Sequence, residues 1–495
     1  HDVLETIGTG PSDRALAVLA DSYLAFHTDG EVISTHRRLV DALTRADILD
    51  DRTVNRLANL LLSITNFSGD TGHQQQTTKA LLPLGARLNP VVMMYRTDLD
   101  DIAHTAQTVR SMLTQYTEWL PRMTAPQVML LSFPAYCVDA MTDFRAPLQQ
   151  AFATLSEHGA SIDAIECGRV VMLDLIAAGQ WEQAEQVGAT CLEMSKQPQG
   201  SALVRHELLA DLGLLAACRG DLDVARRYAA EVTAWSQPRG LNLLLDIARR
   251  IAVRVALAEA DYEAAYRAAI AISPPGQFPP HNVEVGEDML DLVTAATLAG
   301  HTGEASTHVA EAVRLRIGDY SPRVAALNLA VQAMIAPDSE PDELYRSALT
   351  HPGIAEFPFD HARIALAQGM WLRRSRRPTE AGTVLELAAE TFDRLGARPW
   401  AERARAEFRA AAAATNQSPG EFSVLSAQEL RTAELAANGQ TTKQIAEQLS
   451  LSPRTVDAHL SRAFRKLGIT RRAALSQALL QHDSELRAAV KGDAQ

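Results

Sequence analysis

Near the carboxyl end, one short stretch carries side chains that could form hydrogen bonds and ion pairs along one side of a helix. Helical spacing gathers two small residues, an aspartate and three arginines on that side: Arg454, Asp457, Ala458, Ser461, Arg462 and Arg465. Such a side suits a helix in the major groove, where its first residues reach base edges and arginines reach phosphates. The stretch therefore predicts a helix that reads double-stranded DNA.

The opposite side of the same stretch is apolar. Val456, Leu460, Ala463, Phe464 and Leu467 recur at helical spacing and form a continuous stripe. A stripe of this kind must be buried against other elements, so we expect it to pack on two helices that precede it.

The residues before this stretch mark the ends of those two helices. Ser426 with Glu429 has the spacing of a capping box, and Leu425 with Leu430 that of a hydrophobic staple. Glycine tolerates the left-handed conformation that ends helices, so the first helix should stop at Asn438-Gly439.

A second capping box and the N-cap of a third helix complete the pattern. Thr441 with Gln444 opens a second helix, whose inward residues include Ile445 and Leu449. Ser450-Leu451 is the turn. Ser452 caps the third helix, and Pro453 fits its first position because no N–H is needed there.

Charge sets this segment apart from the rest of the chain. Residues 423–481 contain eight Lys/Arg against four Asp/Glu, a net of +4, whereas the whole chain is at −13, which leaves −17 for the remainder. Such asymmetry indicates a nucleic-acid module. The alternative is a last amphipathic bundle with a solvated basic face.

These residues resemble a known family. The segments that carry the resemblance are Leu425-Ser426, Glu429, Gly439, Thr442 to Ala446, Leu449, Ser452 to Val456, His459 and Arg465 to Ile469. They are similar to the LuxR-type helix-turn-helix DNA-binding domain.

The resemblance implies roles for individual residues. Bases would face Asp457, Ala458 and Ser461. The phosphate backbone would face Thr442, Lys443, Arg454, Thr455, Arg462 and Arg465. A fourth helix, about residues 472–481, often supports dimerisation in this family, which implies a role for Ala474, Gln477, Ala478 and Gln481.

Two positions depart from the family pattern. Asp457 stands where the family commonly has a basic residue, and a carboxylate there could accept a hydrogen bond from cytosine N4. Gln428 stands where arginine is frequent. His459 lies between the two stripes of the third helix, so we favour packing over phosphate binding.

Residues 160–410 contain a repeat. Four segments share a turn, a bulky residue and a small alanine, and their alanines, Ala184, Ala225, Ala265 and Ala305, are 41, 40 and 40 residues apart. Weaker copies end at Leu344 and Ala381, and earlier units begin near residues 101 and 144. The pattern predicts helical hairpins stacked into a tetratricopeptide-like solenoid with a period near 40. For residues 1–140 an irregular helical bundle is the alternative.

The segment before the DNA module sharpens the resemblance. Residues 357–363, 371–374 and 392–405 resemble the final repeats of the large ATP-binding LuxR regulators. No G-x-x-x-x-G-K-[ST] loop is present, so we predict no ATP binding by this chain. It begins at His1 rather than methionine, which we expect to reflect either missing upstream domains or a processed terminus.

Nothing else in the sequence favours catalysis or a cofactor. The four cysteines, Cys137, Cys167, Cys191 and Cys218, form no C-x-x-C pair, and the histidines form no metal-binding motif. No apolar run is long enough to cross a membrane, and no signal peptide opens the chain. We therefore predict a cytoplasmic protein that is not an enzyme, with no metal and no cofactor.

The expected architecture is all-α. We assign residues 1–95 to a helical N-terminal region with degenerate repeats as one reading, 96–410 to the solenoid, 411–422 to a linker, 423–482 to the helix-turn-helix domain and 483–495 to a polar tail. The predicted function is a DNA-binding transcriptional regulator, a homodimer on operator DNA, whose repeats receive an unknown effector or protein partner. RNA polymerase is a further candidate partner. The alternative is a tetratricopeptide-type scaffold whose last module serves dimerisation.

Overall fold

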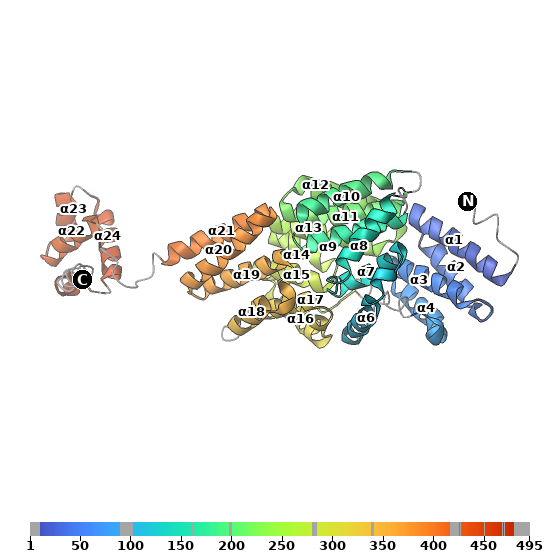
Figure 1. The fold of residues 1–495 in the computed structure, drawn as a ribbon. Coiled ribbons are helices and arrows are strands. Elements are labelled where there is room, and N and C mark those ends of the chain that lie inside the picture. Colours follow the sequence, from blue (N-terminus) through green and yellow to red (C-terminus); the bar gives the residue numbers. More distant parts are fainter. Residues whose placement is uncertain are drawn as a thin grey trace. The chain divides into compact units, whose positions relative to one another are not determined.

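Helices make up all the regular structure that can be described. The computed structural model describes residues 10–89, 102–157, 159, 162–197, 200–279, 285–337, 341–415, 425, 427–449, 451–467, 469 and 471–479. These residues fall into two compact units that divide between Ala411 and Ala412 (Figure 1). Within those ranges no strand occurs, and the all-α class is confirmed.

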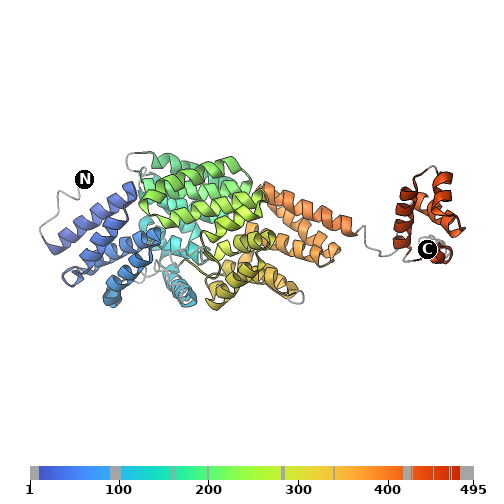
Figure 2. The ribbon, with the colours of Figure 1, turned by 180° about the vertical axis from the view of Figure 1, so that it is seen from behind.

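The larger unit contains six consecutive helical hairpins. In each one, two helices are joined by a short turn and pack against each other. Figure 2 shows the same helices from behind. The pairs are α9 (Ile162–Ala177) with α10 (Trp181–Ser195), α11 (Ala202–Arg219) with α12 (Leu222–Ser236), α13 (Asn242–Ala258) with α14 (Tyr262–Ile270), α15 (Val285–Ala299) with α16 (Thr302–Arg314), α17 (Pro322–Ile335) with α18 (Pro341–Leu349), and α19 (Pro358–Arg374) with α20 (Pro378–Leu395).

The turns inside five of these hairpins share one backbone conformation. Gly179, Gly220 and Gly300 have φ values of 77°, 88° and 92°, in the left-handed region that glycine adopts without a Cβ clash. Ala260 and Arg376 take the same conformation at φ 60° and 59°. In each turn the next residue donates its N–H to a carbonyl five residues earlier, as in a Schellman motif.

The alanines of the predicted repeat lie where the second helix of each hairpin packs on its neighbours. Ala184, Ala225, Ala265, Ala305 and Ala381 are all 0% exposed. Any larger side chain at these positions would push the helices apart, which explains why a small residue recurs. The weaker copy at Leu344 is offset by one residue, because Leu344 is half-buried and Tyr345 is the residue in the core.

The hairpins are preceded by α6 (Ile102–Thr117), α7 (Ala125–Cys137) and α8 (Arg145–Glu157), and are followed by α21 (Arg398–Thr415). The predicted linker was placed from residue 411, yet α21 continues to Thr415. Its last residues are alanines, the strongest helix formers, which explains the extension.

The N-terminal helices have a core of their own. They are α1 (Pro11–Asp29), α2 (Ile33–Leu43), α3 (Asp51–Ser68) and α4 (Thr71–Leu81), with short 3-10 turns at Ala46–Ile48 and Leu82–Arg87. Phe26, Leu39 and Leu57 are completely buried there. The same core includes Leu209 of α11 and Leu244 of α13, so these helices pack on a part of the chain far away in sequence.

The superhelix also closes on itself. Arg110 of α6 donates to the Tyr320 carbonyl, Arg323 N–H donates to Asp139, and Arg398 of α21 pairs with Asp221. These partners are separated by 210, 184 and 177 residues. The recurring separation indicates that about this length of chain makes one superhelical turn, so that segments one turn apart contact each other.

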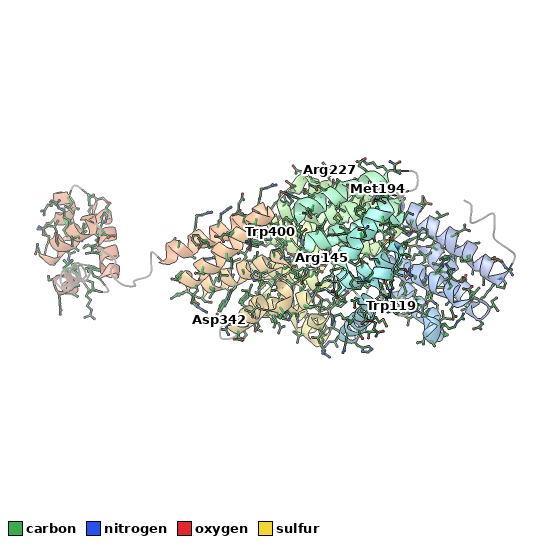
Figure 3. The ribbon with its side chains drawn as sticks, in the orientation of Figure 1. Trp119, Arg145, Met194, Arg227, Asp342 and Trp400 are labelled. Atoms are coloured by element: carbon green, nitrogen blue, oxygen red, sulfur yellow. The ribbon has the colours of Figure 1, made fainter. Side chains whose placement is uncertain are left out.

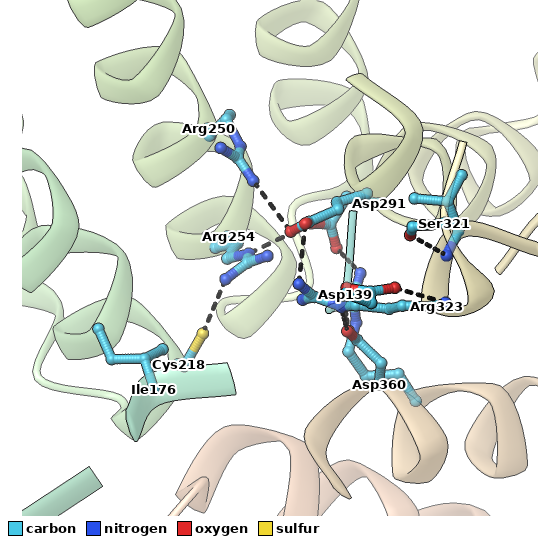
Figure 4. A network of polar contacts seen from close by, with 12 residues as sticks. Asp139, Ile176, Cys218, Arg250, Arg254, Asp291, Ser321, Arg323 and Asp360 are labelled. Carbon is cyan, nitrogen blue, oxygen red and sulfur yellow. Dashed lines mark hydrogen bonds and ion pairs between the residues drawn. The ribbon is translucent and has the colours of Figure 1, made fainter. Parts of the chain in front are cut away.

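Buried ion pairs join the first helices of successive hairpins (Figure 4). Arg254 of α13 donates to Cys218 Sγ at 3.2 Å and to Asp291 Oδ2 of α15 at 3.3 Å. Arg363 of α19 bridges Asp291 and Asp360. Arg323 extends this set through bonds to Asp360 (2.6 Å) and Glu287 (2.8 Å). We call all of these residues together the inner ion network.

Every guanidinium of the inner ion network is matched by a carboxylate. Asp360 is 2% exposed. Burial alone would raise the pKa of Asp360, but the guanidiniums of Arg323 and Arg363 more than offset this and hold it at about 2. The carboxylate is therefore charged at neutral pH, and the network links four hairpins through desolvated charges.

Candidate nucleic-acid interface

The described part of the smaller unit contains α22 (Ala427–Ala437), α23 (Thr442–Leu449) and α24 (Pro453–Lys466), and residues 475–479 are also helical. Gly439 ends α22 in the left-handed region at φ 85°, as the sequence predicts. The Ser426 cap and the Ser450 turn position lie outside the described residues.

Both of the other predicted caps are formed. Thr441 N–H donates to Gln444 Oε1 at 2.8 Å, and Gln444 N–H donates back to Thr441 Oγ1 at 3.4 Å. At α24 the Thr455 N–H donates to Ser452 Oγ at 3.1 Å, and Pro453 occupies the first helical position. These bonds satisfy N–H groups that a helix start leaves without a partner, so both helix starts are fixed locally.

The apolar stripe of α24 lies in the unit's core, as predicted. Val456 and Ala463 are 0% exposed and Leu460 is 5% exposed, against Ile445 of α23 and Ala433 of α22. With this side of the helix anchored, its rotation about its own axis is set, and the opposite side must face outward.

The predicted hydrophobic staple is wrong for one of its two residues, Leu430. Leu425 is buried in the core, but Leu430 is 38% exposed. The buried side of α22 instead carries Glu429, Thr432 and Ala433, which share helical spacing, and Leu430 lies about 100° away from them.

The outward side of α24 exposes the two described base-reading candidates. Asp457 and Ser461 are both exposed. Thr442, at the start of α23, donates its hydroxyl to Asp457 Oδ1 at 3.2 Å. This bond links a base candidate to a backbone candidate, and it holds the carboxylate at the junction of the two helices. The side chain of the third candidate, Ala458, lies outside the described part.

The backbone-contact candidates surround this junction. Lys443 is exposed on α23, and Thr455 is half-buried, with its hydroxyl 2.7 Å from Ser452 Oγ. The side chains of Arg454, Arg462 and Arg465 are outside the described part, although their backbone belongs to α24. His459 is half-buried between the two sides of the helix, which agrees with the packing role favoured from sequence.

A fourth segment closes the unit after α24. Arg472, in the 3-10 turn Arg472–Ala474, donates to the Gln440 carbonyl, and Ser476 Oγ donates to the Ala437 carbonyl at 3.3 Å. Sequence reasoning missed the Arg472 bond, because nothing in a basic residue after a helix shows that it folds back on an earlier turn.

The dimerisation candidates occupy different environments in that segment. Gln477 is exposed, Ala474 is half-buried and Ala478 is 9% exposed, and Gln481 lies outside the described residues. Gln477 is therefore the described candidate with the greatest access to a partner.

Comparison with known proteins identifies this unit. Residues 423–478 match the family described as bacterial regulatory proteins, luxR family. The smaller unit is therefore a LuxR-type helix-turn-helix domain, in agreement with the resemblance drawn from its sequence. In it, α23 and α24 are the two helices of the motif.

The comparisons with whole proteins are less close. The apo form of RapI aligns with 80% of this chain and 98% of its own at 10% identity and a TM-score of 0.37. A Rap protein complexed with competence and sporulation factor aligns with 82% and 98% at 10% identity and a TM-score of 0.34. No curated protein matches the chain in sequence.

Proposed function

We propose that this chain is a transcriptional regulator that binds operator DNA through α24 and receives a signal through its helical repeats. The observation that carries the proposal is the orientation of α24. Its apolar stripe is buried in the domain core, and this leaves Asp457 and Ser461 exposed beside Lys443. A helix held this way can enter the major groove with hydrogen-bonding groups toward base edges.

The charge distribution supports the same proposal. The helix-turn-helix segment is cationic in an otherwise acidic chain, so attraction to phosphates would come from this domain alone. In the proposal, Asp457, Ala458 and Ser461 read bases. Thr442, Lys443, Arg454, Thr455, Arg462 and Arg465 hold the backbone, and a dimer forms through the segment that contains Gln477.

The repeats would serve as the regulatory part and not as a catalyst. No helix of the described ranges is long and apolar enough to cross a membrane. Stacked hairpins offer extended surfaces to partners, and RNA polymerase is one candidate for them. Operator DNA in bacteria lies in the cytoplasm, so we expect the regulator to act there.

A salt titration tests DNA binding. The affinity of the full chain for duplex fragments should fall steeply as salt rises, because phosphate contacts release counterions. In Lys443→Ala the slope of log affinity against log salt should become shallower by about one. Lys79→Ala, an exposed lysine on α4 in the repeat region, is the matched control and should leave the slope unchanged.

The same titration separates the second candidate function, a scaffold whose last module only dimerises. A scaffold would show no affinity for DNA even at low salt. The exposed Gln477 keeps this candidate in consideration, because it gives the module a free polar surface on its fourth segment. Absence of binding at low salt would replace the proposed regulator with the scaffold.

A further inference from the structure

A small cavity lies next to the inner ion network. It has a volume of about 50 Å³ and is lined by residues of α13, α15, α17, α18 and α19 and of the start of α21. Asp291 and Arg363 of the network form part of its lining. Its walls are mainly apolar, and they include Leu298, Met370 and Trp400, the last of which is labelled in Figure 3.

Three arginines line this cavity against a single carboxylate. The carboxylate, Asp291, already accepts hydrogen bonds from Arg254 and Arg363. The other two arginines, Arg374 and Arg403, form no ion pair with any carboxylate in the described ranges. The lining therefore carries an excess of positive charge that no protein group within it neutralises.

Arg403 is the less hydrated of these two arginines. Its guanidinium lies 5.1 Å from the centre of the Tyr262 ring and donates to Met370 Sδ at 3.7 Å. Desolvation by burial lowers the pKa of Arg403, because water is replaced by weak acceptors. Glu407, one helical turn further along α21, acts on Arg403 as a nearby negative charge, but its carboxylate pairs with Arg373 at 2.6 Å. A guanidinium in this position gains from any anion that reaches it.

We propose that this cavity binds a short aliphatic carboxylate, with the carboxylate between Arg403 and Arg374 and the hydrocarbon part against Met370 and Trp400. The enclosed volume restricts the size of the ligand. A cavity of about 150 Å³ holds benzene, so this one admits a smaller apolar group, and the head group stays at the mouth near the exposed Arg374. That this ligand regulates DNA binding rests on the proposed function. That it binds in the cavity does not.

The position of the cavity gives the ligand a structural effect. Its lining comes from α13, α15, α17, α18, α19 and α21, so an occupant would contact consecutive hairpins at once. Binding to the folded repeats alone must stabilise them by linkage. All five tryptophans, including Trp371 and Trp400, belong to the larger unit, so their fluorescence follows that unit without interference from the DNA-binding domain.

Calorimetry on the full chain with butanoate, 1-butanol and butylamine tests the site. Butanoate should bind, 1-butanol should bind at least tenfold more weakly, and butylamine should not bind. Arg403→Gln should raise the Kd of butanoate at least tenfold. Arg374→Gln, which changes an exposed residue and so does not endanger folding, should raise it several-fold. Arg409→Gln, exposed on the same helix as Arg403, is the control and should bind like wild type.

Several outcomes would overturn the site. One is that no straight-chain carboxylate of three to five carbons binds, and another is that 1-butanol binds as tightly as butanoate. A third is that neither Arg403→Gln nor Arg374→Gln weakens binding while tryptophan fluorescence shows both variants to be folded.

A separate measurement of DNA affinity, with and without butanoate, distinguishes this proposal from the proposed function. Binding of butanoate by a chain that never binds DNA would leave the site standing and remove its role in regulation. DNA binding by a chain that ignores every carboxylate would do the reverse.

Discussion

The two units use the same charged residue types in opposite ways. In α24, aspartate, serine and arginines share one side of a helix, and the described members Asp457 and Ser461 face outward. In α13, α15 and α19, arginines and aspartates also recur at helical spacing, yet Arg254, Asp291 and Asp360 are all at least 92% buried. A charged stripe therefore does not by itself mark a surface.

The difference lies in what the facing helix offers. Each buried guanidinium of the inner ion network meets a carboxylate from another hairpin, so desolvation is offset by charge-assisted hydrogen bonds. On the outward side of α24, the described Asp457 and Ser461 are exposed and not covered by a facing helix. The charge of this side remains available to a partner of opposite sign, which is what a phosphate backbone supplies.

Removing one buried charge tests the first half of this comparison and should have the largest effect. Asp360→Ala leaves Arg323 and Arg363 without their shared carboxylate, which we expect to lower the free energy of unfolding by about 3–5 kcal/mol. Urea unfolding followed by tryptophan fluorescence measures this. Asp223→Ala, which removes an exposed partner of Arg226, should change it by less than about 0.5 kcal/mol. Equal losses in the two variants would contradict the contrast.

The second half of the comparison concerns base reading. If the outward side of α24 reads sequence, Asp457→Ala and Ser461→Ala should each relax the preference at one base pair by about 1–3 kcal/mol. Selection of bound fragments from genomic DNA measures the preference. Glu434→Ala, an exposed change on α22, is the control and should leave the selected sequence as it is. An unchanged sequence with Asp457→Ala and Ser461→Ala would move specificity to other residues.

The N-cap of α24 tests whether residues next to the helix in sequence stabilise its start. Ser452→Ala removes the hydroxyl that accepts the Thr455 N–H and should destabilise the domain by about 1 kcal/mol. Hydrogen exchange of the domain's amides in the full chain should then speed up about fivefold. Ser461→Ala alters an exposed serine inside the same helix, where alanine is the better helix former, and should not speed exchange. Faster exchange in that variant as well would argue against a capping effect.

The smallest change in stability is expected for a third arrangement of charge, in which carboxylates outnumber cations. It surrounds Glu166 of α9, whose neighbours are Tyr23, His27, Asp163, Arg169 and Glu207. Burial, together with the Glu207 and Asp163 carboxylates, raises the pKa of Glu166 to about 8. Burial also raises the pKa of Glu207 to about 7 and lowers that of His27 to about 4, so His27 stays neutral above pH 6.

The sign of the pH effect follows from these shifts. A carboxyl whose pKa is higher in the folded state than in the unfolded state favours folding at low pH, and this stability is lost as pH rises from about 4.5 to about 8. The free energy of unfolding in urea should fall by roughly 1 kcal/mol between pH 6 and pH 8.5, after allowance for screening by solvent. In Glu166→Gln the fall should be shallower, and an identical pH profile would contradict this account.

Local features of the fold were predictable from the sequence because their causes are local. The turn residues Gly179 and Gly220, the small Ala184 and Ala225, and the Ser452 cap each act within a few residues of chain. The same holds for the buried and exposed sides of α24, which follow from helical spacing once three helices are placed around one core.

The arrangement over long distances was not predictable in this way. Whether Arg323 meets Asp139, 184 residues away, depends on small rotations between hairpins that add up over a superhelical turn. For the same reason, no sequence pattern distinguishes the buried Arg254 and Asp291 from exposed charged residues of an amphipathic helix. The sequence does not predict the bond from Thr442 to Asp457, because the way α23 and α24 cross cannot be inferred from the residues of either helix alone.

The core shared by α1–α4 with α11 and α13 has a consequence for biosynthesis. Phe26, Leu39 and Leu57 are translated some 150 residues before the helices that complete their core. At bacterial elongation speeds these helices wait on the order of ten seconds with apolar surface open to water. A chaperone that holds nascent chains should therefore associate with this amino-terminal segment on the ribosome and leave once residue 258 has emerged.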